Sequence, residues 1–158
     1  MEALAQKVGE RLKAARAKLV TAESCTGGWA AQVVTSVAGS SAWFERGFVT
    51  YSNEAKREVL GVEQSTLRAH GAVSEETARE MAQGALSRGK GTVALAVTGV
   101  AGPGGGTPDK PVGMVCFAWA SPRSVSSETR QFTGDRESVR RQSVVRALEG
   151  VLQHLERG

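Results

Sequence analysis

The sequence is poor in the residues that metal chemistry and histidine-based catalysis require. It contains two cysteines, Cys25 and Cys116, two histidines, His70 and His154, and a single tyrosine. The cysteines are too far apart for a CxxC redox pair or a zinc-finger spacing, and the isolated histidines cannot form an HExxH motif. We therefore expect no metal and no cofactor. A hydrolase built from this sequence needs a base other than histidine.

The sequence also lacks a long apolar run and a cluster of basic residues. No stretch approaches the 18 apolar residues of a membrane span, and the N-terminus has no signal-peptide pattern, so we expect a cytoplasmic protein with reduced thiols and no membrane partner. The net charge is +4, but lysine and arginine are spread along the chain. Nucleic acid is therefore not an expected partner, whereas a small anionic ligand such as a phosphate is favoured.

The length of 158 residues is close to that of one typical domain. No internal repeat or linker divides the chain, so residues 1–158 are predicted to form one domain. Apolar patterns and turn residues predict alternating elements. The fold expected from them is α/β, with a mixed sheet covered by helices on both faces in three layers. The predicted helices are residues 2–17, 29–37, 54–60 and 74–87 and a last one that starts after 135; the predicted strands are 19–23, 42–51, 92–97, 112–120 and 126–132.

Ser24 lies where a predicted apolar strand turns sharply into a helix. Such a turn exposes a hydroxyl and directs the following backbone N–H groups, those of Cys25 and Thr26, toward the same point. This is the arrangement that acyl transfer requires of a nucleophile and an oxyanion site. Two other interpretations stay open from this segment alone: the hydroxyl of Ser24 or Thr26 caps the helix, or Cys25 is the nucleophile.

Tyr51 and Lys56 form a second candidate group. Tyr51 is placed at the end of a predicted strand, and Lys56 follows in the first turns of the next helix. A lysine removed from water can replace histidine as the base for a serine, and a phenol can relay or orient the proton. Taken alone, Lys56 also fits an ordinary solvated lysine on a helix surface.

A loop rich in glycine and proline, residues 99–111, follows a buried strand. Its glycines, including Gly99, Gly102 and Gly104, let the backbone approach a ligand closely. The loop matches neither the dinucleotide-binding nor the triphosphate-binding glycine motif. Thr98 ends the preceding strand, a position where functional hydroxyls often lie in α/β sheets. The alternative is an ordered crossover on the surface.

Three arginines lie near the start of the predicted last helix. Arg136 and Arg140 are about one turn apart, and Arg141 follows directly. Cations there oppose the helix dipole, which suggests that they hold an anion together with the helix end. The alternative is a solvated basic surface paired with Glu137.

Four segments in register together resemble one known family, the CinA C-terminal domain family, whose characterised members are nicotinamide-nucleotide amidases. The resemblance covers nearly the whole chain. The segments are Thr21-Ala-Glu-Ser-Cys-Thr-Gly-Gly28, Thr50-Tyr-Ser-Asn-Glu-Ala-Lys56, Gly71-Ala-Val-Ser-Glu-Glu-Thr77 and Thr98-Gly-Val-Ala-Gly-Pro-Gly-Gly105.

The resemblance implies hydrolysis of nicotinamide mononucleotide to nicotinic acid mononucleotide and ammonia, a salvage step toward NAD. It implies that Ser24 is the nucleophile, that Tyr51 and Lys56 activate it, and that Thr98 belongs to the active-site loop. It also places an arginine of the last helix at the site, with Arg140 the better match and Arg141 the second, and we expect these arginines to bind the phosphate.

The family also suggests a homo-oligomer with its sites near an interface. Larger members carry an additional N-terminal domain, which is not expected here, and with it no pyrophosphatase activity. A different class of function stays open: an inactive nucleotide-binding or regulatory module with the same fold. An amidase that uses Cys25 is a third possibility.

Overall fold

The computed structural model describes residues 1–157 and contains a five-stranded sheet with the order β2-β1-β3-β4-β5. Strand β1 pairs in parallel with β2 on one side and with β3 on the other, whereas the β3–β4 and β4–β5 pairs are antiparallel. The sheet is therefore mixed, as predicted. The strands are β1 (Leu19–Glu23), β2 (Phe44–Val49), β3 (Val93–Gly99), β4 (Met114–Ser121) and β5 (Ser124–Gln131).

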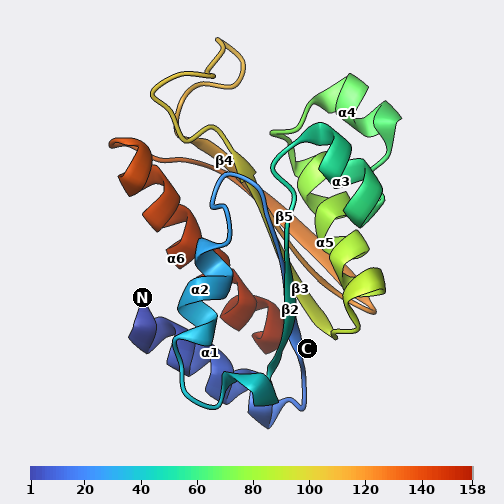
Figure 1. Ribbon diagram of the computed structural model, residues 1–158, viewed down its shortest axis with the longest axis vertical. Coiled ribbons are helices and arrows are strands. Elements are labelled where there is room, and N and C mark those ends of the chain that lie inside the picture. Colours follow the sequence, from blue (N-terminus) through green and yellow to red (C-terminus); the bar gives the residue numbers. More distant parts are fainter. Residues whose placement is uncertain (158) are drawn as a thin grey trace.

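Helices cover the sheet on both faces, which confirms the predicted α/β fold class (Figure 1). One face carries α1 (Glu2–Ala14), α2 (Trp29–Thr35) and α6 (Arg136–Glu156). The other carries α3 (Asn53–Leu60), α4 (Gln64–His70) and α5 (Glu75–Gly89). Within residues 1–157, none of these helices is long and apolar enough to cross a membrane.

Two apolar clusters hold the layers together, one on each face of the sheet. The cluster under α1, α2 and α6 is built from large side chains such as Leu12, Phe117 and Leu148. The cluster under α5 is built mostly from alanine, with Met81 as a larger member. Small side chains let α5 lie close to the strands, and this explains how a chain with few aromatic residues packs a three-layer core.

Several predicted boundaries differ from the structure. The predicted strand 42–51 is too long, because residues Ser40–Ala42 form a turn of 3₁₀-helix and β2 covers only Phe44–Val49. Helix α4 was not predicted: it has no buried residue, so it leaves no apolar stripe in the sequence. The predicted start of the fifth strand is two residues late, since β5 begins at Ser124.

The topology places the ends of three strands at one edge of the sheet. After β1 the chain crosses to β2 on one side, whereas β3 pairs with β1 on the other side. In α/β sheets, ligands bind at the carboxyl ends of strands where the connections diverge in this way. Backbone hydrogen bonds fix the ends there: Ser24 N–H donates to the Val97 carbonyl (2.9 Å) and Thr50 N–H donates to the Glu23 carbonyl (2.9 Å).

Candidate active site

A cavity of about 300 Å³ lies at this edge of the sheet. The segments after β1, β2 and β3 line it together with the turn between α4 and α5 and the first residue of α6. Most of the residues singled out from the sequence therefore meet in one place, although they come from segments far apart in the chain. The lining residues are Ser24, Cys25, Tyr51, Asn53, Lys56, Ala72, Val73, Thr98, Gly99, Val100, Ala101, Gly102, Gly104, Gly105 and Arg136.

Lys56 reaches Ser24 inside the cavity. The Lys56 Nζ donates hydrogen bonds to Ser24 Oγ (3.0 Å) and to the Thr50 carbonyl (3.1 Å). Lys56 is only 1% exposed and Ser24 8%. These two hydrogen bonds hold the Lys56 side chain inward, and Ser52 fixes the start of α3 by accepting a hydrogen bond from the Ala55 N–H (3.0 Å). The solvated-surface interpretation of Lys56 is therefore wrong.

Burial also changes the acidity of Lys56. No carboxylate forms a salt bridge with its ammonium group in the described part of the chain. Removal from water therefore penalises the charged form and lowers the pKa of Lys56 below its ordinary value of 10.5. A lysine with a lowered pKa spends more of its time as a neutral amine, which is the form that can accept a proton from a hydroxyl.

The turn after Ser24 is fixed by a carboxylate that the sequence analysis did not single out. Glu23 is fully buried, and its Oε1 accepts hydrogen bonds from Thr26 Oγ1 (2.7 Å) and the Ala30 N–H (2.8 Å). Its Oε2 accepts from the Ala31 N–H (3.1 Å). The N-cap position of α2 is Gly28, which has no side chain, so Glu23 caps the helix instead. A buried-strand pattern that ends in an acidic residue just before a helix is the signal that could have identified it.

Cys25 also faces the cavity, but its thiol is a poor nucleophile. Its side chain is buried, and burial raises the pKa of the Cys25 thiol to about 12. The thiolate is the reactive form of cysteine, and it is almost absent at neutral pH when the pKa is this high. The structure therefore favours Ser24 over Cys25 as the nucleophile.

Tyr51 lies at the mouth of the cavity rather than at the serine. Its side chain is 61% exposed, and its hydroxyl accepts a hydrogen bond from Arg136 Nη2 (3.0 Å). Arg136 Nη1 donates to the Gly102 carbonyl (2.7 Å), so this arginine bridges Tyr51 and the glycine-rich loop. Among residues 1–157, no hydrogen bond joins Tyr51 to Ser24 or Lys56.

The two arginines that the resemblance favoured lie outside this cavity. Arg140 Nε donates to the Cys25 carbonyl (3.0 Å) and Arg140 Nη2 to the Thr26 carbonyl (3.2 Å). Arg141 pairs with Glu137 on the surface (3.3 Å). Both guanidinium groups also lie over the Trp29 ring, at 5.4 and 5.3 Å from its centre. Arg136 is the arginine of α6 that lines the cavity.

Thr98 and three glycines of the predicted loop also line the cavity, whereas Thr26 lines a separate hollow. Thr98 is buried at the end of β3, and its Oγ1 donates to the Ala72 carbonyl (2.9 Å), which ties the strand to the turn between α4 and α5. Gly99, Gly102 and Gly104 line the cavity through their backbone. The loop is tied to the rest of the molecule through Lys110 Nζ, which donates to the His70 carbonyl.

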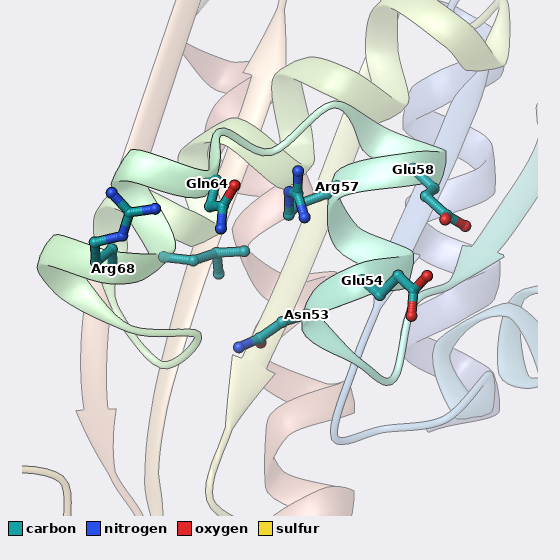
Figure 2. A pocket seen from close by; sticks show the side chains of 7 residues that line it. Asn53, Glu54, Arg57, Glu58, Gln64 and Arg68 are labelled. Atoms are coloured by element: carbon teal, nitrogen blue, oxygen red, sulfur yellow. The ribbon is translucent and has the colours of Figure 1, made fainter.

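A larger hollow of about 560 Å³ lies between α3 and α4 (Figure 2). The figure shows charged side chains of both signs around it, among them Arg57, Arg68 and Glu54. It has neither a buried nucleophile nor a buried base, so its chemistry does not compete with that of the Ser24 cavity. Within residues 1–157, no group of three His, Cys, Asp or Glu side chains is placed to share a metal ion.

Comparison with known proteins agrees with the resemblance seen in the sequence. The family model described as CinA C-terminal domain matches residues 1–155. A protein of Escherichia coli strain K12 named nicotinamide-nucleotide amidohydrolase PncC is 54% identical over 151 residues, which cover 95% of this chain and 92% of that protein. A protein of the same name from Pseudomonas putida is 53% identical and covers 95% of this chain and 94% of its own length.

Solved structures show the same architecture. A CinA superfamily protein from Klebsiella pneumoniae superposes with a TM-score of 0.96 at 39% identity and covers 99% of this chain and 98% of its own. A competence/damage inducible protein from Agrobacterium tumefaciens gives a TM-score of 0.93 at 46% identity and covers 98% of this chain and 94% of its own.

Proposed function

Since the chain belongs to the CinA C-terminal domain family, we propose that it hydrolyses the carboxamide of nicotinamide mononucleotide, giving nicotinic acid mononucleotide and ammonia. The reaction is a step of pyridine nucleotide salvage. The single observation that carries the proposal is the contact between the buried Lys56 Nζ and Ser24 Oγ (3.0 Å), in a cavity large enough for the nicotinamide end of the substrate. The names of the relatives at 53–54% identity support the substrate.

The first chemical step is attack by Ser24. Lys56 in its neutral form donates one N–H to the Thr50 carbonyl and accepts the hydroxyl proton of Ser24 with its lone pair. The Ser24 oxygen then attacks the amide carbon of the substrate. We assign Lys56 as the immediate proton acceptor because it lies within hydrogen-bonding distance of Ser24, whereas the Tyr51 hydroxyl is directed to Arg136.

The second step is loss of ammonia. Attack places a negative charge on the former carbonyl oxygen, and the N–H groups of Cys25 and Thr26 are the donors that we assign to it. Ser24's own N–H is not available, because it donates to the Val97 carbonyl. The protonated Lys56 gives its proton to the leaving nitrogen, and water then hydrolyses the acyl-enzyme with Lys56 again acting as the base.

The phosphate of the substrate is assigned to Arg136. Arg136 is a cation at the mouth of the cavity, and its guanidinium group is held there by the Tyr51 hydroxyl and the Gly102 carbonyl. A guanidinium group binds phosphate oxygens through paired N–H groups. In this arrangement Tyr51 orients Arg136, and Arg140 and Arg141 do not contact the phosphate.

The test is ammonia release from nicotinamide mononucleotide by the purified protein. Wild-type protein should release ammonia, and Ser24→Ala should lower the rate by at least ~10³-fold without loss of fold. Ser65→Ala is the matched control, since Ser65 is exposed on α4 and lies outside the cavity. Its rate should equal that of the wild type.

Binding measured by calorimetry separates the two classes of function. Ser24→Ala should still bind nicotinamide mononucleotide, because the arginine and the cavity remain. Tight binding by the wild type with no ammonia release would favour a regulatory module instead. A rate unchanged in Ser24→Ala would refute the assignment of the nucleophile.

A further inference from the structure

Arg140 lies behind the turn that carries Ser24, not in the cavity in front of it. It lines a separate hollow with Thr26, Gly27, Gly28 and Trp29. Its Nε and Nη2 groups donate to two consecutive carbonyls, those of Cys25 (3.0 Å) and Thr26 (3.2 Å). A lysine has no such fork, so this double contact needs arginine.

The contact with Cys25 determines the orientation of one peptide group. The peptide between Cys25 and Thr26 is trans, so its N–H points opposite to its carbonyl. With the carbonyl held by Arg140, the Thr26 N–H points away from the guanidinium group. This N–H is one of the two donors assigned above to the oxyanion.

The carbonyl of that peptide is bound by Arg140 rather than by the backbone of the turn. Within residues 1–157, Arg140 Nε is the partner found for the Cys25 carbonyl, whereas the Ser24 carbonyl accepts from the Gly27 N–H and the Thr26 carbonyl also accepts from the Trp29 N–H. Gly27 and Gly28, which follow, have positive φ angles of 58° and 104°. Glycine adopts both signs of φ readily, so the φ preferences of Gly27 and Gly28 add little restraint to the orientation of this peptide.

Arg140 is itself held in place. Its guanidinium group stacks over the Trp29 ring at 5.4 Å, and Trp29 is the first residue of α2. On the other side of the same turn, the buried Glu23 binds the Thr26 hydroxyl (2.7 Å). Thr26 is therefore held at its side chain by Glu23 and at its backbone by Arg140.

We propose that Arg140 is a positioning residue that holds the Cys25–Thr26 peptide with its N–H ready for the oxyanion. The proposal rests on the function proposed above. The positive charge next to the Cys25 carbonyl also polarises the peptide, which makes the Thr26 N–H a stronger donor. Arg140 thus acts on the transition state without contact with the substrate.

The experiment compares Arg140→Met with Arg141→Met. Arg141 is the matched control because it lies next to Arg140 on the same helix and over the same Trp29 ring, yet it contacts Glu137 rather than the turn. Arg140→Met should lower kcat by about 10- to 100-fold with little change in KM, since loss of an oxyanion donor costs roughly 10²–10³-fold. Arg141→Met should leave both constants unchanged. Arg140→Lys should recover little of the lost kcat.

Two further measurements decide the outcome. A rise in KM for nicotinamide mononucleotide with kcat unchanged in Arg140→Met would overturn the proposal and assign Arg140 to the phosphate. The rate of Ser24 labelling by a fluorophosphonate tests the turn without any nicotinamide substrate, because its P=O oxygen needs the same donors. Slower labelling in Arg140→Met but not in Arg141→Met supports the proposal even if the wild type acts on another amide, and equal labelling in all three proteins contradicts it.

Discussion

The surroundings of Lys56 determine whether its side chain can accept a proton from Ser24. A solvated lysine stays protonated far above neutral pH and cannot take a proton from a serine. Lys56 differs because it is 1% exposed and has a hydroxyl and a carbonyl as neighbours rather than a carboxylate. The scarcity of histidine in the sequence therefore does not leave the proposed mechanism without a candidate base.

Lys56 should set the pH dependence of the reaction. In the proposed mechanism the active form of Lys56 is the neutral amine, so kcat/KM should rise with pH until Lys56 has lost its proton and then level off. Burial lowers the pKa of Lys56, so the midpoint of this rise should lie below 10.5. Lys56→Arg cannot lose its proton and should lower the rate by at least ~10²-fold at every pH.

The control for this prediction is Lys7→Arg on the exposed surface of α1, which should keep both the rate and the midpoint of the wild type. The measurement is the rate of ammonia release between pH 6 and pH 10. A Lys56→Arg variant that keeps the wild-type rate and the same rise would show that another group supplies the base.

The sequence predicts which residues belong to the site, whereas the structure shows which side chains contact one another. The motif around Ser24 predicted a nucleophile on a turn, and the resemblance paired it with Lys56. Neither the motif nor the resemblance could show that Arg136 donates a hydrogen bond to Tyr51, or that Arg140 donates to the backbone of the turn. Both contacts depend on how α6 packs against the sheet. Side-chain direction across two elements is not readable from the spacing within one.

Among the elements, α2 depends most on a group outside itself. It has seven residues, and short helices are marginal without tertiary support. Its first residues donate their N–H groups to Glu23, which belongs to β1 and is fully buried. The strand thus caps the helix, and the turn between them, with Ser24 at its start, is held at both ends.

Glu23→Gln should weaken this connection. A glutamine can still accept from one side, but its amide group then faces the Ala31 N–H, which is also a donor. The expected loss is about 1–3 kcal/mol of unfolding free energy, as for other buried charged hydrogen bonds. Denaturation in urea measures it. Glu10→Gln on the exposed side of α1 is the control and should unfold like the wild type. An equal midpoint for both variants would show that Glu23 does not stabilise the turn.

Element types were easier to predict than element ends. Every predicted strand exists, and Gly61 ends α3 in the left-handed conformation that favours glycine. Helix α4 was missed because it lies on the surface with only Leu67 packed against the core. A helix held by its neighbours rather than by an apolar stripe gives little signal in its own residues.

At the scale of the whole molecule, the fold class was predictable because the alternation of apolar strands and amphipathic helices determines it. The strand order was not, since the sequence does not say on which side of β1 each later strand pairs. That order decides the location of the site. With β2 on one side of β1 and β3 on the other, the segments after all three strands surround Ser24, and α6 closes the cavity from the far end of the chain.

The packing of α6 on the sheet also makes the stability of the protein depend on pH. Two of the contacts between the helix and the sheet involve groups that titrate: Arg146 binds Glu128 on β5 through two hydrogen bonds of 2.7 Å, and His154 contacts Ser121 Oγ at 3.0 Å. Although burial alone raises the pKa of Glu128, its hydrogen bonds with Arg146 and Arg130 outweigh burial and lower the pKa below 4.5. Glu128 therefore contributes stability that is lost only as the pH falls below about 4.5.

His154 makes the free energy of unfolding depend on pH in a higher range than Glu128 does. Burial, with a smaller effect of Arg157, lowers the pKa of His154 below its ordinary value of 6.5. As the pH falls below 6.5, the unfolded chain binds a proton there before the folded protein does, so the free energy of unfolding decreases until the pH reaches the folded pKa. Between pH 7 and pH 5, His154→Asn should therefore lose less stability than the wild type. Ser121→Ala keeps the buried imidazole and should retain the wild-type slope. Urea denaturation at several pH values measures both slopes, and equal slopes for wild type and His154→Asn would assign the acid sensitivity to another group.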